Sequence, residues 1–381
     1  MERRTKRKCA VCAVLAVVLL SLLAAHRGAA YPPAMPSSWG SFGDFYPAYE
    51  AEDDWKPVAV EKLRCLSGVI TVATGGRTGN QIMEYASAWS LAQQYGLQLA
   101  VPTEMVSTLH TVFQNLSATP LEDLLQRPSC KAHRLRETEV LRYATNDSLL
   151  YPVSRYVQWA LRHSQPIILR KWIVVTESIA YMSGKLHKEF RYRREYADMA
   201  ERTLTRVRRA AAQKAGSHYS KVLTVSIHVR RSDYASYLIH RFNAKNMAEV
   251  GYYRRAAKRM RELLEPEPAA LAFIVASDDS EWCQNTLLPA LNRDFQEGSP
   301  PSSVFLTSDN SSSSPVHDLA VLSAADHSVL SYGTFGTWAA LMAGGRAIVF
   351  DLAAANPHLP PGTRNSAMSF APHLPSWELL T

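Results

Sequence analysis

The chain has 381 residues, and a hydrophobic content of 47% is enough for a sizeable core. The formal net charge is +8, but residues 1–8 hold five Lys/Arg and one Glu and so carry +4, which leaves only +4 for the rest. This weak charge, without a basic stripe interleaved with aromatic residues, excludes a general nucleic-acid-binding surface.

An uncharged apolar run follows this basic cluster. Residues 9–25, CAVCAVLAVVLLSLLAA, are close to the shortest length that spans a membrane as a helix. We therefore predict a cytoplasmic tail over 1–8, a transmembrane signal anchor over 9–25 and the rest of the chain in a lumen. A cleaved signal peptide is the alternative, and it leads to the same secretory compartment. Residues 26–64, rich in Pro, Ser and Gly, predict an exposed stem.

Sequons and cysteines agree with a secretory compartment. Three glycosylation sequons begin at Asn115, Asn146 and Asn310. Outside the apolar run the cysteines are Cys65, Cys130 and Cys283. They allow at most one intrachain disulfide, and the sequence leaves its pairing open. Their spacing gives no zinc-binding pattern, so we expect no structural zinc site.

The elements of a parallel α/β sheet begin after the stem. Residues 68–74 predict a strand, 80–96 a helix and 97–102 the next strand. Further along, we expect a strand within 167–176 and a charged helix near 193–214. Other segments up to residue 215 give no clear pattern. Together these elements predict an N-terminal, acceptor-side α/β domain over 65–215.

Strands and helices alternate regularly from Lys221 onward. The predicted strands are 222–229, 271–277, 303–308, 327–331 and 346–351, and the predicted helices lie near 250–265, from 278, at 316–325 and at 335–343. This alternation predicts a second, doubly wound domain over 216–381. We therefore expect an α/β protein made of two Rossmann-like domains with a cleft between them.

The first of three polar motifs is GGRTGNQ, residues 75–81, which follows a predicted strand. Ligands of α/β sheets bind beyond the carboxyl ends of the strands. Here Gly76 allows a tight turn and close backbone approach, Arg77 adds a positive charge, and the following helix offers its N-terminal amides to an anion. An ordinary turn with a solvent-facing Arg77 is an equally weighted alternative.

The second motif is HVRRSD, residues 228–233. His228 and Arg230 are two residues apart, so they share one face of the strand that ends there. The guanidinium of Arg230 suits a diphosphate, because it can hold phosphate oxygens with two hydrogen bonds. Asp233 is expected to fix an arginine or to accept a proton. The alternative is an internal Arg–Asp pair that only closes the loop.

The third motif is SYGTFGT, residues 331–337, which opens a helix. Ser331, Thr334 and the backbone amides around them form a second helix start ready for an anion. On the preceding helix, the carboxylate of Asp318 suits either the paired N–H groups of a base such as guanine or the cap of its own helix. Local sequence alone favours a core position for Phe335.

Adjacent acids at Asp278 and Asp279 resemble a metal site at first sight. Neighbouring acids tend to point apart, however, and the Asp-x-Asp spacing occurs nowhere in the chain. We therefore expect Ser277 and Asp278 to cap a helix together with Glu281.

Together and in this order, the three motifs resemble those of the galactoside α-1,2-fucosyltransferases, glycosyltransferase family 11. The matching segments are GGRTGNQI (75–82), HVRRSDY (228–234) and GTFGTWAA (333–340), with departures at Thr78, Ile82 and Ser232. The resemblance spans roughly 68–351. It implies a GT-B-type fold and metal-independent, inverting transfer of L-fucose from GDP-β-L-fucose to the 2-hydroxyl of a terminal β-galactoside on a glycan. It also implies a single-pass Golgi membrane protein with a lumenal catalytic domain and no cofactor.

The resemblance further implies roles for individual residues. It places Arg230 on the β-phosphate, His228 near the nucleoside and Asp318 on guanine. Thr334 and Phe335 would wrap the diphosphate, and Arg77 and Asn80 match a loop that reaches the donor phosphate and the acceptor.

The general base is assigned less directly. Asp233 is the first candidate and Glu84 the second, and late departure of the acceptor proton without a dedicated base is the alternative.

Two other functions also stay open, because the motifs concern the donor. The chain is then either a fucosyltransferase with another linkage or acceptor, or a non-catalytic lumenal protein that binds GDP.

Overall fold

The computed structural model describes residues 59–144, 153–216, 219, 221–307, 314–360 and 362–381. The predicted tail, the predicted signal anchor, most of the predicted stem and two sequon residues, Asn146 and Asn310, lie outside these ranges. No helix within them is long and apolar enough to cross a membrane. The elements described below all belong to one compact unit.

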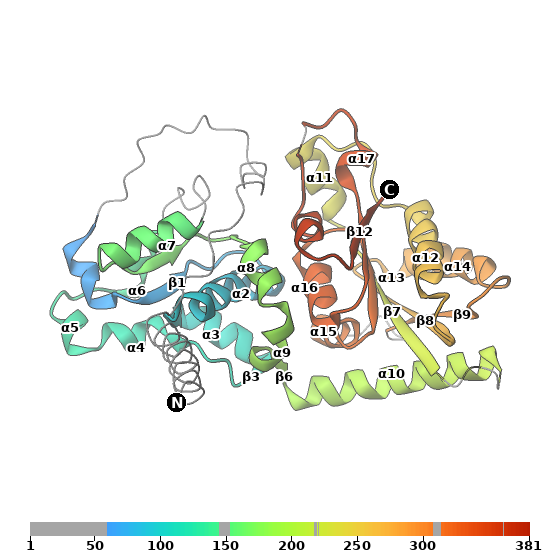
Figure 1. Cartoon of the computed structure of the whole chain (residues 1–381), viewed down its shortest axis with the longest axis horizontal. Coiled ribbons are helices and arrows are strands. Elements are labelled where there is room, and N and C mark those ends of the chain that lie inside the picture. The colour runs from blue at the N-terminus through green and yellow to red at the C-terminus, as the bar shows by residue number, and fades with distance from the viewer. Residues whose placement is uncertain (1–58, 145–152, 217–218, 220, 308–313, 361) are drawn as a thin grey trace, which may run out of the picture. The chain divides into compact units, whose positions relative to one another are not determined.

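A four-stranded parallel sheet in the order β4-β2-β1-β5 forms the first part of this unit (Figure 1). Its strands are β1 (Val69–Val72), β2 (Gln98–Val101), β4 (Thr119–Pro120) and β5 (Ile167–Leu169). On one face, Ile70 and Val72 pack in the same core as helix α2 (Thr78–Tyr95), while Val69 packs with residues of the 3₁₀ helix η2 (Glu61–Leu66). Strands covered on both faces read as continuous apolar runs. The predicted strand–turn–helix–strand unit is therefore confirmed.

Short elements fill the region for which the sequence gave no clear pattern. They are α3 (Thr103–His110), β3 (Phe113–Gln114), α4 (Leu121–Leu125), α5 (Pro128–Lys131), α6 (Glu137–Leu141), α7 (Val153–Arg162), α8 (Thr176–Tyr181), η4 (Ser183–Lys185), α9 (Leu186–Glu189) and β6 (Arg191–Tyr192). Strands β3 and β6 pair antiparallel. Most of these elements are too short to display a helical period, which explains why no pattern was visible.

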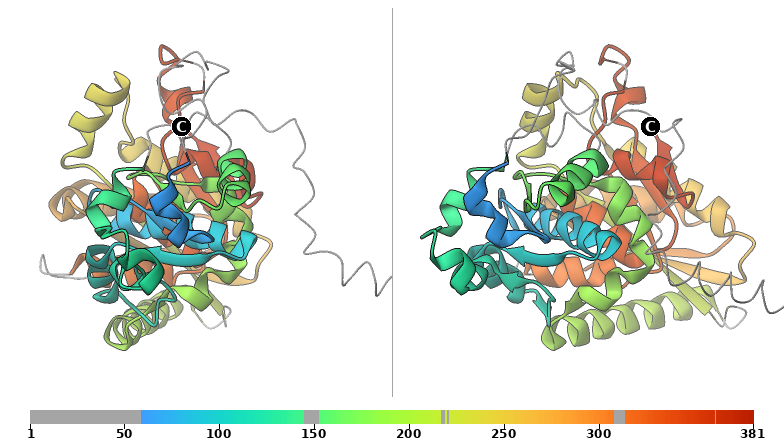
Figure 2. Two further views of the ribbon diagram at one scale, coloured as in Figure 1. Left: turned by 90° about the vertical axis from the view of Figure 1, so that its left-hand side faces the viewer. Right: turned by 60° about the vertical axis from the view of Figure 1, so that its left-hand side comes forward.

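A six-stranded, fully parallel sheet in the order β12-β11-β10-β7-β8-β9 forms the rest of the unit. Its strands are β7 (Lys221–Val229), β8 (Ala269–Ser277), β9 (Ser302–Leu306), β10 (His327–Leu330), β11 (Ala347–Phe350) and β12 (Trp377–Leu380). Alternate residues of β8 face opposite helix layers. Ala272 and Ile274 pack with α10 (Arg194–Ala215), the long light-green helix of Figures 1 and 2, whereas Phe273 lies in the other core cluster.

Helices connect these strands much as the sequence predicted. They are α11 (Tyr234–Phe242), α12 (Val250–Leu264), α13 (Ser280–Trp282), the π-helical turn η5 (Cys283–Leu287), α14 (Leu288–Asp294), α15 (Pro315–Ser323), α16 (Thr334–Ala343), α17 (Leu352–Ala355) and η6 (Met368–His373). Four elements were not predicted: α11 occupies a stretch without a predicted element, β12 adds an edge strand, and α17 and η6 lie between β11 and β12. The helix expected from Asp278 begins at Ser280 instead.

Aromatic side chains join α16 to the first part of the unit. The indole of Trp338, which is fully buried on α16, lies 4.5 Å from the ring of Phe190 and 6.3 Å from that of Phe113, measured between ring centroids. Edge-to-face pairs of this kind add to the stabilisation from buried area. This contact places the start of α16 close to α2, which matters for the site below.

A disulfide joins Cys65 to Cys130, while Cys283 is free and buried. The pairing that the sequence left open is thereby resolved. Residues 61–64, which we expected in the stem, instead belong to η2, because Leu63 is buried in a small core and the disulfide follows directly. The other domain boundaries drawn from the sequence stay predictions.

Candidate functional site

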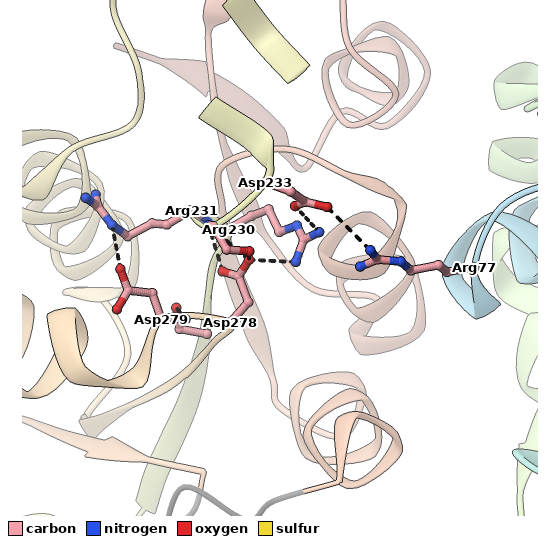
Figure 3. A network of polar contacts seen from close by, with 8 residues as sticks. Arg77, Arg230, Arg231, Asp233, Asp278 and Asp279 are labelled. Atoms are coloured by element: carbon pink, nitrogen blue, oxygen red, sulfur yellow. Dashed lines mark hydrogen bonds and ion pairs between the residues drawn. The ribbon is translucent and has the colours of Figure 1, made fainter. Parts of the chain in front are cut away.

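The loop after β7 sends two arginines in different directions (Figure 3). Arg230 pairs with Asp233 and donates from Nη1 to Asp278 Oδ2 at 2.6 Å. Arg231 donates to Asp279 Oδ2 at 3.2 Å and to Glu249 Oε2 at 2.9 Å. Both arginines follow the last residue of β7, Val229, and their side chains point apart. Each guanidinium is thus held by two carboxylates.

Asp278 organises this loop, and sequence reasoning missed its role. Its carboxylate accepts hydrogen bonds from the backbone amides of Arg231, at 2.9 Å, and Ser232, at 3.2 Å, and from the Ser232 hydroxyl. Burial disfavours ionisation of Asp278, but these hydrogen bonds and the charge of Arg230 outweigh it and hold its pKa below the ordinary value. An ionised Asp278 therefore fixes both the loop backbone and Arg230.

The expected capping role of Asp278 is wrong. Asp279 caps α13 by accepting from the Trp282 amide at 3.1 Å, and the Ser277 hydroxyl accepts from the Asp279 amide at 2.9 Å. The two acids do point apart, so only one of them faces the helix. The pairing of the strands explains the role of Asp278. Because β8 pairs with β7 in parallel, the acids that follow β8 lie beside the arginines that follow β7.

Asp233 links this loop to a distant one. Besides Arg230, it pairs with Arg77, with 3.7 Å between Nη2 and Oδ2 (Figure 3). Arg77 precedes the first turn of α2, and its side chain is 85% exposed. The internal pair of Arg230 with Asp233, which was the alternative to a binding site, is therefore present. Asp233 also pairs with Arg77, however, and closing the loop does not require this second arginine. Two guanidinium groups converge on one anion, a geometry suited to phosphate.

Glu84, the second candidate for the general base, is fully buried on α2. Its carboxylate accepts hydrogen bonds from the backbone amides of Trp172 and Gly75 and, at 3.4 Å, from the Thr74 hydroxyl. Burial raises the pKa of Glu84 to about 7 against the opposing effect of these bonds. The carboxylate is therefore enclosed, and its oxygens are occupied by these donors. A role for Glu84 as the base stays a prediction.

The N-terminal ends of α2 and α16 meet beside the arginines. The Thr334 hydroxyl donates to Asn80 Oδ1 at 2.9 Å, and a Cβ added at Gly79 would lie 3.0 Å from the Thr334 hydroxyl oxygen. Gly76 has a φ of +73°, and a Cβ there would lie 2.1 Å from Asn80 Nδ2. Within the described residues neither helix has a side-chain cap, so each presents its positive dipole end to an anion.

His228 lies at the end of β7, with its ring centroid 5.2 Å from that of Phe335. Burial lowers the pKa of His228 to about 4, so the imidazole is neutral near pH 7. Its Nδ1 has no hydrogen-bond partner within the described part of the chain, and a Cβ at Gly336 would lie only 2.4 Å from it. Phe335, expected in the core, is partly exposed. The close approach requires glycine at position 336.

The remaining predicted site residues lie in different surroundings. Ser331 is fully buried, so its hydroxyl is enclosed by protein. Asp318 is in the first turn of α15, is 14% exposed, and has an oxygen 3.9 Å from His317 Nδ1. The sequon residue Asn115 is exposed. Within the described ranges, no group of three or more His, Cys, Asp or Glu residues is arranged to hold a metal ion.

Comparison with known proteins assigns the family. The model of Glycosyl transferase family 11 matches residues 167–377, which is more than half of the chain. The chain belongs to this family. The family resemblance of the three motifs is therefore confirmed.

Among its relatives is Galactoside 2-alpha-L-fucosyltransferase Sec1 of Mus musculus, which is 28% identical over 280 residues, covering 73% of this chain and 65% of the relative. Galactoside 2-alpha-L-fucosyltransferase SEC1 of Bos taurus is 28% identical over 319 residues, covering 81% of this chain and 73% of the relative. The chain thus spans less than two thirds of the length of the mouse protein.

A solved structure of an Arabidopsis thaliana FUT1 mutant in complex with GDP is also similar, with 15% identity, a TM-score of 0.42, and coverage of 74% of this chain and 69% of that one.

Proposed function

We propose that this member of the family is an α-1,2-fucosyltransferase, which transfers L-fucose with inversion from GDP-β-L-fucose to the 2-hydroxyl of a terminal β-galactoside on a glycan. The observation that carries the proposal is the convergence of Arg77 and Arg230 on Asp233, next to two uncapped helix N-termini. The names of the relatives support the choice of sugar and linkage. The two parallel sheets, with α16 packed beside α2, support a GT-B-type arrangement.

In this proposal the donor diphosphate replaces the Asp233 carboxylate between the two guanidinium groups. Arg230 then holds the β-phosphate, and Asp278 keeps its guanidinium in place through the 2.6 Å hydrogen bond. Arg77 is mostly exposed and meets Asp233 at 3.7 Å, so it can move to a phosphate oxygen without losing buried contacts. The amides at the starts of α2 and α16, with Thr334, Gly76 and Asn80, would complete the anion site.

Charge stabilisation is the main catalytic task. As the bond between fucose C1 and the phosphate oxygen breaks, negative charge grows on GDP, and the acceptor oxygen forms the new bond to C1 from the opposite face. Preorganised donors aimed at developing charge often supply the largest part of catalysis. Arg230 and Arg77 therefore act as catalytic residues, and the neutral His228 beside Phe335 would contact the nucleoside. Asp318 would accept from guanine.

Asp233 remains the candidate base once the diphosphate has taken its arginine partners. It is 54% exposed, so a bound hydroxyl could reach it, whereas Glu84 is buried. In this step the acceptor hydroxyl proton passes to the Asp233 carboxylate while the acceptor oxygen bonds to C1. A positioned base contributes on the order of 10²–10⁴ in rate. We include metal independence in the proposal, because the arginines supply positive charge at the leaving group.

We also propose that the chain works in the Golgi lumen, held by residues 9–25 as a signal anchor. The disulfide between Cys65 and Cys130 supports an oxidising compartment. The exposed Asn115 is accessible for glycosylation, and the proposal extends to Asn146 and Asn310. Protection of the tagged C-terminus from protease in sealed microsomes, together with a mass shift on endoglycosidase treatment, would test this topology.

Product analysis tests the function directly. The purified full chain is incubated with GDP-fucose and a panel of β-galactosides that includes lactose, and the products are analysed by mass spectrometry and NMR. An α-1,2-linked fucose on galactose is the expected product. Another linkage would identify a different fucosyltransferase, and GDP binding without any product would identify a non-catalytic protein.

A further inference from the structure

An exposed tryptophan follows β5 in a strained backbone conformation. Trp172 is 54% exposed, and its φ is +63°. The left-handed region is a genuine outlier for a bulky aromatic residue, and holding such a residue there costs on the order of 1–3 kcal/mol. Strain of this kind persists only where the surroundings enforce it, and it often marks a binding site.

Two contacts fix Trp172 in this position. The buried carboxylate of Glu84 accepts a hydrogen bond from the Trp172 amide and another, at 3.1 Å, from the Gly75 amide. The indole lies directly against Gly75, since a Cβ added there would be 2.7 Å from Trp172 Nε1. One glutamate therefore holds the backbone of Trp172 and the glycine turn together. The indole of Trp172, and not an unusual φ, fills the space that a Cβ at position 75 would take.

The topology brings this indole to the proposed reaction centre. β5 and β1 are parallel neighbours, so the loops that follow them emerge at the same edge of the sheet. Gly75 is two residues before Arg77, which limits the separation of their Cα atoms to about 7 Å. Lys171 also belongs to this loop, with its ammonium 4.5 Å from the centre of the indole. An exposed aromatic surface, the Lys171 ammonium and the indole N–H thus lie beside Arg77.

We propose that Trp172 is the platform on which the acceptor sugar stacks. Pyranosides of the galactose type present a face of C–H groups that packs on an aromatic ring, while their hydroxyl groups seek polar partners. The Lys171 ammonium and the indole N–H would supply such partners. This inference rests on the acceptor half of the proposed function. It assigns galactoside affinity to Trp172 and leaves donor binding to the arginines.

The test compares Trp172→Gly and Trp172→Phe with the wild-type chain. Glycine removes the indole and accepts the positive φ without strain, whereas phenylalanine keeps an aromatic surface. We expect Trp172→Gly to raise the KM for phenyl β-galactoside by about tenfold, the size of a stacking contact, with the KM for GDP-fucose unchanged. Trp172→Phe should restore most of the affinity. Tyr181→Ala, which removes a 72% exposed aromatic side chain from α8, is the control and should change neither constant.

A binding measurement separates this inference from the proposed function. Calorimetric titration with phenyl β-galactoside tests the platform, and titration with GDP-fucose tests the donor site. If the wild type does not bind GDP-fucose but binds the galactoside, and galactoside binding weakens in Trp172→Gly, the proposed function is refuted and the role of Trp172 as a platform is supported. An unchanged galactoside affinity in Trp172→Gly overturns the platform, as does a wild type that binds no galactoside. If the glycine variant does not fold, loss in Trp172→Phe of the galactoside-induced change in tryptophan emission supports the platform, and a retained change overturns it.

Discussion

Replacing Asp278 with alanine should both destabilise the protein and weaken donor use. The substitution removes the acceptor for four donors: the amides of Arg231 and Ser232, the Ser232 hydroxyl and the Arg230 guanidinium. A hydrogen bond contributes about 0.5–1.5 kcal/mol net, and more when a partner is charged. The side chain is 20% exposed, so water can partly replace the lost acceptor. We therefore expect the free energy of unfolding to fall by about 2–3 kcal/mol.

Thermal unfolding and initial rates measure the two effects. At roughly 2 °C per kcal/mol for a chain of this size, Tm should fall by about 4–6 °C. Because Arg230 keeps only Asp233 as a partner, its position becomes less defined, and kcat/KM for GDP-fucose should fall by about 10²-fold. KM for the acceptor should stay unchanged, since Asp278 acts as a positioning residue for the donor arginine. Asp278→Asn keeps the shape of the side chain, so its Tm and its kcat/KM for GDP-fucose should lie between those of the wild type and those of Asp278→Ala.

The matched control is Asp294→Ala. Asp294 also holds an arginine, through two 2.7 Å hydrogen bonds from Arg254, but on the surface between α12 and α14. Exposed ion pairs contribute little to stability. If Asp278→Ala matches this control in both Tm and donor kcat/KM, Asp278 does not organise the loop and the reasoning is refuted.

Three further predictions concern charge. Arg230→Ala should abolish GDP-fucose turnover in a protein that stays folded by circular dichroism, and near-native activity would remove Arg230 from the phosphate site. Excess EDTA should leave fucose transfer intact, whereas complete loss restored by manganese would reverse the metal-free proposal. The pKa of Glu84 rises from 4.5 in the unfolded chain to about 7 in the fold. The stabilisation that comes from the protonated Glu84 carboxyl is therefore fully present below pH 4.5 and is lost as pH rises through 7. Relative to Glu84→Gln, the wild type should lose about 3 kcal/mol of unfolding free energy across this range in urea titrations, and a constant difference would contradict the shift.

The regular parts of the fold were predictable because burial on both faces leaves a clear pattern. Strands such as 222–229 and 271–277 are continuous apolar runs, and Gly96 ends α2 in the left-handed conformation that glycine favours. Helix α11 was missed because its charged and aromatic residues follow the arginine motif and mostly remain exposed. Strand β12 has only four residues and pairs with β11 alone.

The charged residues of the site were predictable, because each lies in a polar motif that follows a predicted strand. Arg77, Arg230 and Asp233 come together as ion pairs, although they derive from two motifs about 150 residues apart. The role of Asp278 could not be found locally, because it depends on which strand lies beside β7. Trp172 was missed for a similar reason. Trp172 meets Gly75 because β5 pairs with β1, and this pairing could not be predicted from the sequence.

The bond between Cys65 and Cys130 determines how mechanical load would enter this fold. Any pull applied from the N-terminal side reaches η2 first, only a few residues before β1. Without the cross-link, tension would peel β1 away from its neighbours and dismantle the turn that carries Arg77. With it, force passes at residue 65 into a covalent loop with a sequence separation of 65 residues and reaches α5 as well. A pull on the N-terminal side of residue 65 is therefore mechanically insulated from the turn that carries Arg77.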